Sequence, residues 1–564
     1  MIGEPREIQR ETGYFDSDAN LRRLLENTAP DLLRRREDDL YEFGRWAAGE
    51  VDEQAAYTDR YAPPELQTYG RDGSVINRIV HNPAYEAAHR GAYERGMIGA
   101  CYGERAEPHC LSFVMGYLLT QADISISCPV TLTGAVAHVL HTSAPEAIRE
   151  RYLPELTRTD GGAATGGTWA TELHGGSDVG ATTTVARAAG EGRELTGLKW
   201  FTSNANSSLA LATARPEGAE AGWRGLGVYL VPSWLEDGSA NRYRIRRLKE
   251  KLGTKGLATG EIELEEARAV EVAPPPEGFR LMMEALEYSR VHNAAGSAGL
   301  QRRAFTEALG WSRGREAFGW RLADFPMVQE TLLTMLVQQE ADTALAMESA
   351  FAFDRALSDP EEKTWLRVAT ALAKYRAAEN AVVSAREALE LFGGNGYTKD
   401  YAAERLLRDA QVATVWEGPA NIQALELLRM LSGKYPGFEA FERRVRAVIE
   451  AMPEGLGELA GALEEALGDC AGAVGYLRER PEEARRHARR LLGLMSDALA
   501  FALLCEEAAT EYSAGNSRKR LVAELFREVS LRPPVRRGIG PRESALSTAQ
   551  RNFDALVDYE PVEA

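Results

Sequence analysis

The feature that most constrains this chain is a change of hydrophobic pattern in its interior. As far as Gly161–Gly167, apolar and charged residues mix mainly at the spacing of amphipathic helices. Beyond that stretch, Leu226–Val231 is a short apolar run and Glu261–Glu265 alternates, as expected for a buried and a half-exposed strand. Three prolines, Pro274–Pro276, form a rigid linker, after which helical spacing returns. The pattern therefore predicts a β part between two helical parts.

A chain of 564 residues is too long for one hydrophobic core, since domains usually hold about 100–200 residues. An apolar stripe that includes Met327, Leu332 and Met335 is typical of a helical-bundle core. A junction at Leu431–Gly437 precedes the last helical stretch. We predict an α+β, mostly α fold with an N-terminal helical domain at residues 1–165, a central β-sheet domain at 166–276, a four-helix bundle at 277–433 and an additional C-terminal helical domain at 434–564.

Composition narrows the class of protein. No run approaches the roughly 18 apolar residues that a membrane span needs, and the charged start, Met1–Glu7, lacks the apolar core of a signal peptide. No CxxC spacing suggests a metal site or a disulfide framework. We therefore expect no metal, no membrane association and a reducing, cytoplasmic location. The five cysteines are Cys101, Cys110, Cys128, Cys470 and Cys505.

Two segments of the β part suit a planar, phosphate-bearing ligand. Thr168–Asp178 combines glycines, which let backbone approach a ligand closely, with hydroxyls that can bond phosphate or ring heteroatoms. A turn with a helix N-cap is the alternative interpretation. Gly197–Asn204 sets an aromatic pair among hydroxyl residues, as in a strand that stacks one side chain on a planar ring. Here the alternative is an ordinary strand with one aromatic side chain in the core.

Two further segments lie in the second helical part. Leu391–Tyr397 contains Gly-Gly-Asn-Gly, which permits positive φ and is also explained by a helix C-cap alone. In Val415–Ile422, Glu417 follows an apolar and aromatic run and precedes Gly-Pro. A carboxylate in such surroundings tends to have a raised pKa and serves well as a general base. The alternative is a glutamate of a first helical turn near the helix dipole.

Together these segments resemble the acyl-CoA dehydrogenase family, in the family's order and at its spacing. The resemblance covers about residues 80–430. The matching segments are Ala170-Thr171-Glu172 with Gly176-Ser177-Asp178, Lys199–Ser203, Arg315–Gly319, Glu390–Gly396 and Trp416–Pro419.

A closer resemblance, nearly end to end, is to the AidB-like branch of adaptive-response flavoproteins linked to alkylation stress. The additional C-terminal helical domain is similar to that branch as well. The segments that carry this resemblance are Glu11–Phe15, Pro63–Leu66, Ser127–Thr131, Leu248–Gly253, Trp416–Gly418 and Asn421-Ile422.

The resemblance implies FAD as the cofactor. In the family's arrangement Thr171 bonds the edge of the flavin ring, Phe201 flanks the isoalloxazine and Ser203 bonds near N5. Arg315 reaches the FAD phosphates of a neighbouring subunit, which implies a homotetramer. The residues implied to bind the cofactor are Ala170, Thr171, Gly176, Ser177, Phe201, Ser203, Arg315, Phe318, Gly393, Gly394, Trp416, Gly418 and Asn421.

The resemblance also implies a reaction. Glu417 removes the α-proton of an acyl-CoA thioester while the β-hydride passes to flavin N5, and an electron-transfer flavoprotein accepts the electrons. Donors to the thioester oxygen, including the backbone N–H of Glu417, stabilise the enolate charge. Three positions depart from the family pattern: Pro419 replaces a hydroxyl residue, Glu390 replaces a glutamine, and Trp416 is larger than the usual tyrosine.

Two other functions fit parts of the sequence. The AidB-like resemblance suggests DNA binding through residues 438–564, where Arg485–Arg490 and Arg518–Arg520 are clusters of basic residues. However, residues 431–564 hold 19 Lys and Arg against 22 Asp and Glu, and the whole chain has a formal charge of −18. We therefore favour solvated helix faces over DNA binding as the interpretation of these clusters. A non-turnover acyl-CoA binder is the other alternative, against which the retained Glu417 argues.

Overall fold

A computed structural model describes residues 12–190, 192–533 and 544–563. Glu11 and the charged segment Met1–Glu7 lie outside the described residues. The chain forms two compact units: the first combines residues 1–48 with 293–564, and the second comprises residues 49–292. The four domain boundaries predicted from the sequence stay a prediction.

The second unit begins with helices, and two of them are its most apolar elements. Helices α6 and α7 are buried along nearly their whole length. By length and composition α7 could cross a membrane, but 89% of its apolar window is buried inside the protein, as is typical of a core helix. The helices are α4 (Asp52–Tyr61), α5 (Pro83–Glu94), α6 (Cys110–Ala122), α7 (Ile124–Ser143) and α8 (Glu146–Leu156).

A β-hairpin interrupts these helices, in a stretch where the sequence pattern predicts mainly helix. Strands β1 (Glu65–Tyr69) and β2 (Val75–Val80) pair antiparallel. Asn77 joins the hairpin to the edge of the main sheet, because its Nδ2 donates to the Tyr243 carbonyl at 2.6 Å and its Oδ1 accepts from the Ile245 N–H at 3.1 Å. The Asp-Gly turn between two short apolar runs is the sequence signal that could have revealed it.

The described residues of the β part form one seven-stranded sheet, as predicted for a strand-rich centre. Its pairings close on themselves, since β6 pairs with both β4 and β7, β7 pairs with β9, and β9 returns through β5 to β4. Parallel β3 and antiparallel β8 lie at the margins. The strands are β3 (Gly166–Trp169), β4 (Val185–Ala189), β5 (Gly192–Ser203), β6 (Leu209–Pro216), β7 (Gly227–Pro232), β8 (Tyr243–Leu248) and β9 (Thr259–Ala273).

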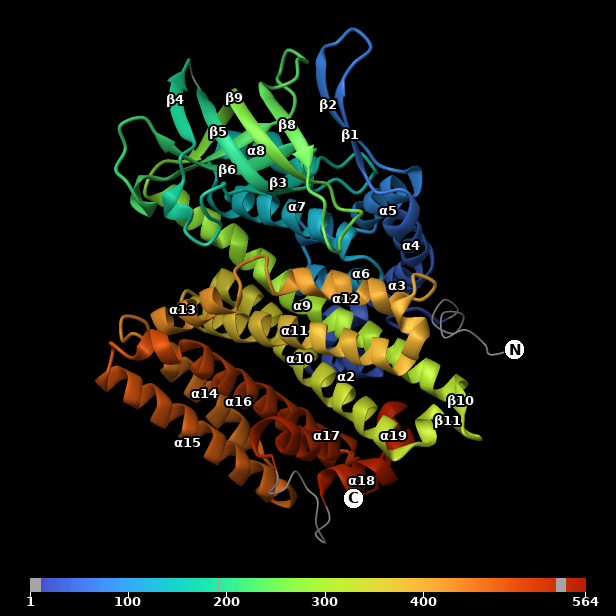
Figure 1. The fold of residues 1–564 in the computed structure, drawn as a ribbon. Helices are drawn as coiled ribbons and strands as arrows, with labels where there is room; N and C mark the ends of the chain where they lie inside the picture. Colours follow the sequence, from blue (N-terminus) through green and yellow to red (C-terminus); the bar gives the residue numbers. More distant parts are fainter. Residues whose placement is uncertain (1–11, 191, 534–543, 564) are drawn as a thin grey trace. The chain divides into compact units, whose positions relative to one another are not determined.

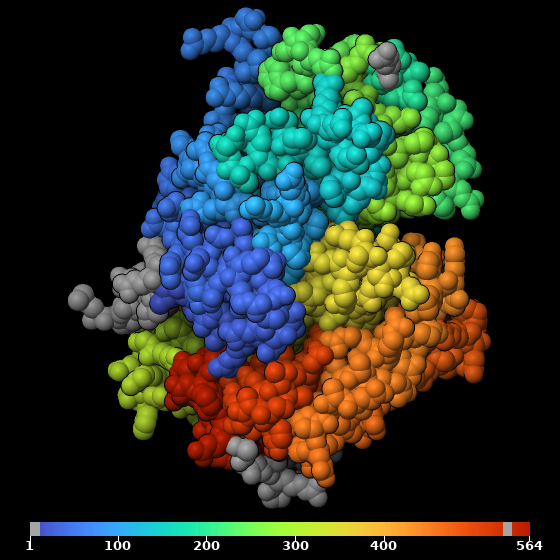
Figure 2. Space-filling view, turned by 180° about the vertical axis from the view of Figure 1, so that it is seen from behind, coloured from blue at the N-terminus to red at the C-terminus, as the bar shows by residue number. Residues whose placement is uncertain are grey.

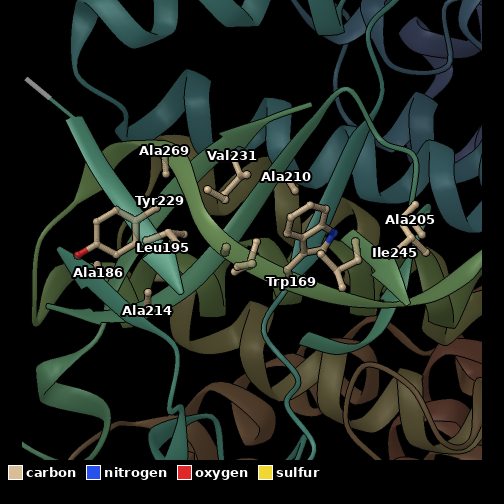
Figure 3. Close-up of a cluster of buried hydrophobic side chains, with 14 of the residues drawn as sticks. Trp169, Ala186, Leu195, Ala205, Ala210, Ala214, Tyr229, Val231, Ile245 and Ala269 are labelled. Atoms are coloured by element: carbon tan, nitrogen blue, oxygen red, sulfur yellow. The ribbon is translucent and has the colours of Figure 1, made fainter. Parts of the chain in front are cut away.

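The sheet encloses an apolar core in which the large side chains of Trp169 and Tyr229 lie among many alanines (Figure 3). On β9 the predicted alternation of a half-exposed strand holds only in part. Glu261 is buried, because Lys249 and Arg247 cover it and bind its carboxylate at 2.6 and 2.7 Å. Ion pairing thus permits a charged residue at a position that the sequence pattern assigned to solvent.

The first unit is built around long helices (Figure 1). Leu332 and Met335 of α10 are buried, as predicted for a bundle core, but Met327 in the first turn of that helix is exposed. The prediction that this stripe lies in the bundle core is therefore wrong for Met327. That residue belongs to the first turn of α10, which begins at Pro326, and its side chain faces solvent. The helices before the C-terminal extension are α2 (Ala19–Thr28), α3 (Pro30–Trp46), α9 (Glu277–Gly314), α10 (Pro326–Ser358), α11 (Glu362–Phe392), α12 (Ala402–Ala413) and α13 (Ala420–Met430), with α9 running across the boundary of the units.

A C-terminal extension packs on this bundle, with α16 against α10, α11 and α13. It forms a continuous surface, orange to red, and its red helices lie against the blue N-terminal segment (Figure 2). There the Lys519 ammonium donates to the side-chain oxygen of Asn20 at 2.6 Å. The helices are α14 (Gly437–Ala451), α15 (Gly457–Glu479), α16 (Ala484–Ser513), α17 (Arg518–Phe526), α18 (Ala545–Arg551) and α19 (Phe553–Val557).

Buried ion pairs anchor the extension. Glu340 of α10 is fully buried and binds Arg518 at 2.5 Å and Lys519 at 2.7 Å. Burial alone raises the pKa of Glu340, but the two cations outweigh it and lower that pKa to about 2. Arg518 and Lys519 therefore do not form the solvated face suggested by the sequence. Their charges are paired with Glu340 inside the protein. The arginines of Arg485–Arg490 are exposed on α16, as that interpretation predicts.

Candidate active site

The residues singled out in the sequence fall into two groups, one in each unit. The second unit holds those of the first two segments, and the first unit holds Glu417 and the remainder. In the second unit the structure places the Thr171 segment beside the strand that carries Phe201 and Ser203. In the first unit the residues stand on three separate segments, after α9, after α11 and from the end of α12 to the first turn of α13. The two groups are Ala170, Thr171, Gly176, Ser177, Phe201 and Ser203, and Arg315, Phe318, Gly393, Gly394, Trp416, Glu417, Gly418 and Asn421.

In the second unit, the end of β3 and the strand β5 form one local arrangement. The Trp200 N–H donates to the Thr171 carbonyl at 3.0 Å, which holds the segment after β3 beside β5. Ala170, Thr171 and Ser203 are half-buried, whereas Gly176 and Ser177 are exposed. Phe201 projects from β5 with 56% of its surface exposed, although it is a large apolar side chain. The sequence-derived alternative placed one aromatic side chain of this strand in the core, and Phe201 is not that residue.

A buried ion pair underlies this arrangement. The Lys199 ammonium lies 2.8 Å from Glu172 Oε1 and also donates to the Thr213 carbonyl at 2.8 Å. Glu172 further accepts the N–H and hydroxyl of both Thr183 and Thr184, at 2.5–3.1 Å. Burial raises the pKa of Glu172, but Lys199 and these donors outweigh it and lower the pKa to about 2. The carboxylate thus stays ionised and ties the Thr171 segment to β5 and to the residues just before β4, while the Lys199 ammonium also bonds β6.

Glu172 and Lys199 were not singled out from the sequence as a pair. Each stands inside a family-like segment, Glu172 directly after Thr171 and Lys199 two residues before Phe201. A charged residue inside an otherwise apolar or hydroxyl-rich stretch was the available signal, since such charges are rarely buried without a partner. The sequence could not say which charge pairs with which.

A cation also lies under the aromatic pair of β5. The Lys249 ammonium is 3.4 Å from the centre of the Trp200 ring and 5.0 Å from that of Phe201. Glu261 binds the same ammonium, so both the charge and the ring position are fixed. Phe201 is therefore presented as a supported, solvent-facing ring, which suits stacking against a planar ligand.

In the first unit, Glu417 lies in the turn between α12 and α13, three residues before α13 begins at Ala420. Its φ is +55°, and that of Gly418 is +92°, so two successive residues are left-handed. Trp416 and Glu417 are both half-buried. Glu417 is therefore not part of a first helical turn, as the dipole-based alternative required, but belongs to a bent connection.

Two glycines of the first unit follow α11. Gly393 caps that helix by donating its N–H to the Glu390 carbonyl, with φ +61°. This confirms the predicted C-cap, and it does not compete with ligand binding, since no atom lies within 4 Å of where a Cβ would stand on Gly393 or Gly394. Asn421, in the first turn of α13, is exposed as well.

Arg315 and Phe318 lie on the surface at the end of α9. The short strands β10 (Glu316–Ala317) and β11 (Trp320–Arg321) form a hairpin with Phe318 at its turn. Phe318 is 96% exposed, and Arg315 is exposed too. Trp320 of the same hairpin is 65% exposed, so two large aromatic side chains face solvent here.

These features fit a cofactor such as FAD. An isoalloxazine ring needs a flat apolar neighbour, which Phe201 provides. Its pyrophosphate needs backbone that it can approach closely, which Gly175 provides, since the space at its Cβ position is open. Hydroxyls for polar contacts stand nearby at Thr171, Ser177 and Ser203.

The chain is similar to known proteins over most of its length. Three family models match successive parts of the chain: the adaptive response protein AidB N-terminal domain at residues 7–160, the acyl-CoA dehydrogenase middle domain at 167–267, and the acyl-CoA dehydrogenase C-terminal domain at 276–431. Acyl-CoA dehydrogenase family member 11 of Caenorhabditis elegans is 31% identical over 457 residues, 77% of this chain and 72% of that protein. The chain belongs to the acyl-CoA dehydrogenase family.

Two further similarities refine this membership. The putative acyl-CoA dehydrogenase AidB of Escherichia coli is 32% identical over 389 residues, 66% of this chain and 69% of that protein. The solved structure of Caenorhabditis elegans ACDH-11 in complex with C11-CoA has a TM-score of 0.85 at 27% identity, and covers 96% of this chain and 95% of that one. The family resemblance with its AidB-like N-terminal part, and the predicted fold class, are thus confirmed.

Acyl-CoA dehydrogenases are FAD-dependent oxidoreductases, and this member is an enzyme of that kind with FAD as its cofactor. The individual cofactor contacts and the role of Glu417 stay predictions. The position and burial of each residue in the structure indicate which substitution tests its role.

Proposed function

We propose that this acyl-CoA dehydrogenase introduces an α,β double bond into an acyl-CoA thioester. The Cα–H bond breaks with its proton passing to the Glu417 carboxylate, and the Cβ–H bond breaks with its electron pair leaving as hydride. The two carbons then share a new double bond. Bound FAD supplies the hydride acceptor, and every other contribution comes from the chain's own residues.

The observation that carries this proposal is the placement of Glu417. It is the glutamate of the family-like segment, and it lies half-buried beside the half-buried indole of Trp416. Partial burial removes competing water from a carboxylate while leaving it open to a substrate. Its left-handed backbone places it in the bent connection between α12 and α13, outside both helices.

The remaining predicted residues have roles that follow from their positions. Phe201 offers its exposed ring to the isoalloxazine, while Thr171 and Ser203 offer polar contacts at its edge. The backbone N–H of Glu417 donates to the thioester oxygen and so stabilises enolate charge. Ala170, Gly176, Ser177, Phe318, Gly393, Gly394, Trp416, Gly418 and Asn421 complete the proposed cofactor contacts.

We propose a medium or long acyl chain as the substrate class, on the strength of the C11-CoA held by the similar worm protein. An electron-transfer flavoprotein is the proposed electron acceptor. A homotetramer is the proposed assembly. It is supported by the exposure of Arg315 and Phe318, which leaves both side chains accessible to a neighbouring subunit. No disulfide joins any of the five cysteines, which lie in the described residues, and this supports the proposed cytoplasmic location.

DNA binding through the extension is the less supported alternative. The burial of Arg518 and Lys519 against Glu340 withdraws two of the three residues of that cluster from any surface role, and the partly exposed Arg520 is paired with Glu524. The exposed arginines of Arg485–Arg490 remain. Binding that relies on them should be weak and fall steeply with salt, by a slope of about 0.9 for each phosphate neutralised.

An anaerobic titration tests the proposed function. Wild-type protein loaded with FAD is mixed with acyl-CoAs of increasing length, including C11-CoA, and the loss of flavin absorbance is followed. Glu417→Gln keeps the shape and removes the proton acceptor, so bleaching should slow by about 10²–10⁴-fold while FAD stays bound. Glu404→Gln is the control, because Glu404 is a half-buried helix glutamate paired with Arg408. Equal bleaching by wild type and Glu417→Gln, or none with any acyl-CoA, would contradict the proposal.

A further inference from the structure

Two buried donors converge on the backbone of the turn that carries Glu417. The amide of Gln423 donates through Nε2 to the Glu417 carbonyl at 3.1 Å and to the Gly418 carbonyl at 3.0 Å. The Lys374 ammonium donates to the same Gly418 carbonyl at 2.9 Å. Each donor side chain is 1% exposed. Gln423 belongs to α13 and Lys374 to α11, so two packed helices of the bundle hold one short turn.

The backbone conformation of this turn is one that needs stabilising hydrogen bonds. Glu417 has φ +55°, in a region that a side chain with a Cβ adopts at a cost in free energy. A residue stays there only where its surroundings over-determine the backbone, and such strain concentrates at functional sites. Three hydrogen bonds to two successive carbonyl groups provide that determination. A base held in this way loses little orientational freedom before it meets a substrate.

Gly418 shows that the turn and its donors are matched. Its φ of +92° favours glycine, and a Cβ added there would lie 2.9 Å from Gln423 Nε2. The glycine is therefore required both for the bend and for the close approach of the amide donor. The Gln423 amide occupies the space that the Cβ of any other residue at position 418 would need.

We infer that Lys374 and Gln423 are positioning residues for Glu417, which they orient through the carbonyl groups of the turn. The inference rests on the proposed function only in naming the consequence, which is faster proton removal. The clamp itself is a property of the folded chain and can be tested without turnover. Neither residue was singled out from the sequence, where each is an isolated polar residue on a helix.

The test uses Gln423→Met and Lys374→Met in the full-length, FAD-loaded protein. Gln301→Met is the matched control, because Gln301 is fully buried in the same bundle and its amide also donates to a carbonyl, that of Ala377, at 3.1 Å. Gln301 lies on α9, and its amide donates to Asp342 and Ala377 rather than to the turn.

The first readout is amide hydrogen exchange in the peptide that spans the turn. The Trp416 and Ile422 amides are hydrogen-bonded on either side of Glu417, at 3.1 and 2.8 Å. Removing one donor should speed their exchange about five- to tenfold, since one hydrogen bond contributes about 1 kcal/mol. Gln301→Met should leave this peptide unchanged. Unchanged exchange in both test variants would overturn the clamp, whatever the catalytic activity.

The second readout is the rate of flavin reduction by the acyl-CoA that bleaches the wild type fastest. A misplaced base should lower the maximal rate on the order of 10²-fold, with the acyl-CoA concentration for half-maximal rate changed less than about threefold. A maximal rate within twofold of wild type in both test variants would overturn the positioning role. A wild type that no acyl-CoA reduces contradicts the proposed function instead, and the exchange data then decide the clamp alone.

Discussion

Each unit of this protein contains a buried carboxylate that basic residues neutralise, and the surroundings of the two differ. Glu172 binds one lysine and four neutral donors from Thr183 and Thr184, next to exposed Phe201 and Ser177. Glu340 binds two cations, Arg518 and Lys519, and all three side chains are buried. The first cluster supports a surface that is open to a ligand, whereas the second joins an added domain to the bundle. The same chemistry thus serves ligand presentation in one unit and assembly of the chain in the other.

The largest effect that these clusters have in common should be acid sensitivity. The pKa of each carboxyl group is lowered from 4.5 to about 2 in the folded protein. Stability from each group is therefore fully present above pH 4.5 and is lost as pH falls toward 2, on the order of 3 kcal/mol per group. Urea unfolding at pH 6, 4 and 3 should show this loss. Glu340→Gln should reduce the acid slope, and a slope that it leaves unaltered would contradict the assignment.

The second cluster should be the more costly of the two to break. Arg518→Met leaves Glu340 buried with Lys519 as its remaining cation, which should destabilise the first unit by about 3–5 kcal/mol. Chemical denaturation followed by circular dichroism measures this. Arg520→Met is the control, because Arg520 is a partly exposed neighbour paired within α17 to Glu524, and it should change stability by less than about 0.5 kcal/mol. If both variants lost similar amounts of stability, burial of the ion pair would not determine the cost of breaking it.

Breaking the Glu172 cluster should cost less stability than breaking the Glu340 cluster. Without Lys199, Glu172 still accepts four hydrogen bonds from Thr183 and Thr184. Lys199→Met should destabilise by about 2–3 kcal/mol, close to the value of a hydrogen bond to a charged group. It should also lower FAD retention, since the Thr171 segment loses its anchor. Flavin content after gel filtration and the denaturation midpoint report the two effects. The Lys199→Met, Glu172→Gln double variant should recover part of the stability, and no recovery would argue against an unpaired carboxylate as the cause.

The smallest effect on stability should come from the ligand-facing surface itself. Phe201→Ala removes a ring that is largely exposed, so stability should change by less than about 1 kcal/mol. FAD affinity should fall about three- to tenfold, as expected for the loss of one aromatic stacking contact. Flavin fluorescence during titration of apoprotein measures that affinity. A large stability loss with unchanged FAD affinity would make Phe201 a core residue and remove the distinction between the clusters.

The sequence by itself determined the order of helical and β parts, the family-like segments, and Glu417 as the candidate base. These depend on local spacing and residue type, which a linear chain displays directly. Phe201 and the glycines after α11 stand in the structure where a ligand can approach, and Glu417 lies half-buried in its turn.

Only the tertiary structure decided which charges are buried and which backbone is bent. Arg518 and Lys519 have the appearance of a solvated cluster of basic residues until the distant Glu340 is placed between them, 178 residues away for Arg518. Glu172 and Lys199 become a pair, and Lys374 and Gln423 reach the Glu417 turn, only through long-range packing. The physical reason is that burial and pairing are properties of contacts between remote segments, which hydrophobic periodicity does not encode.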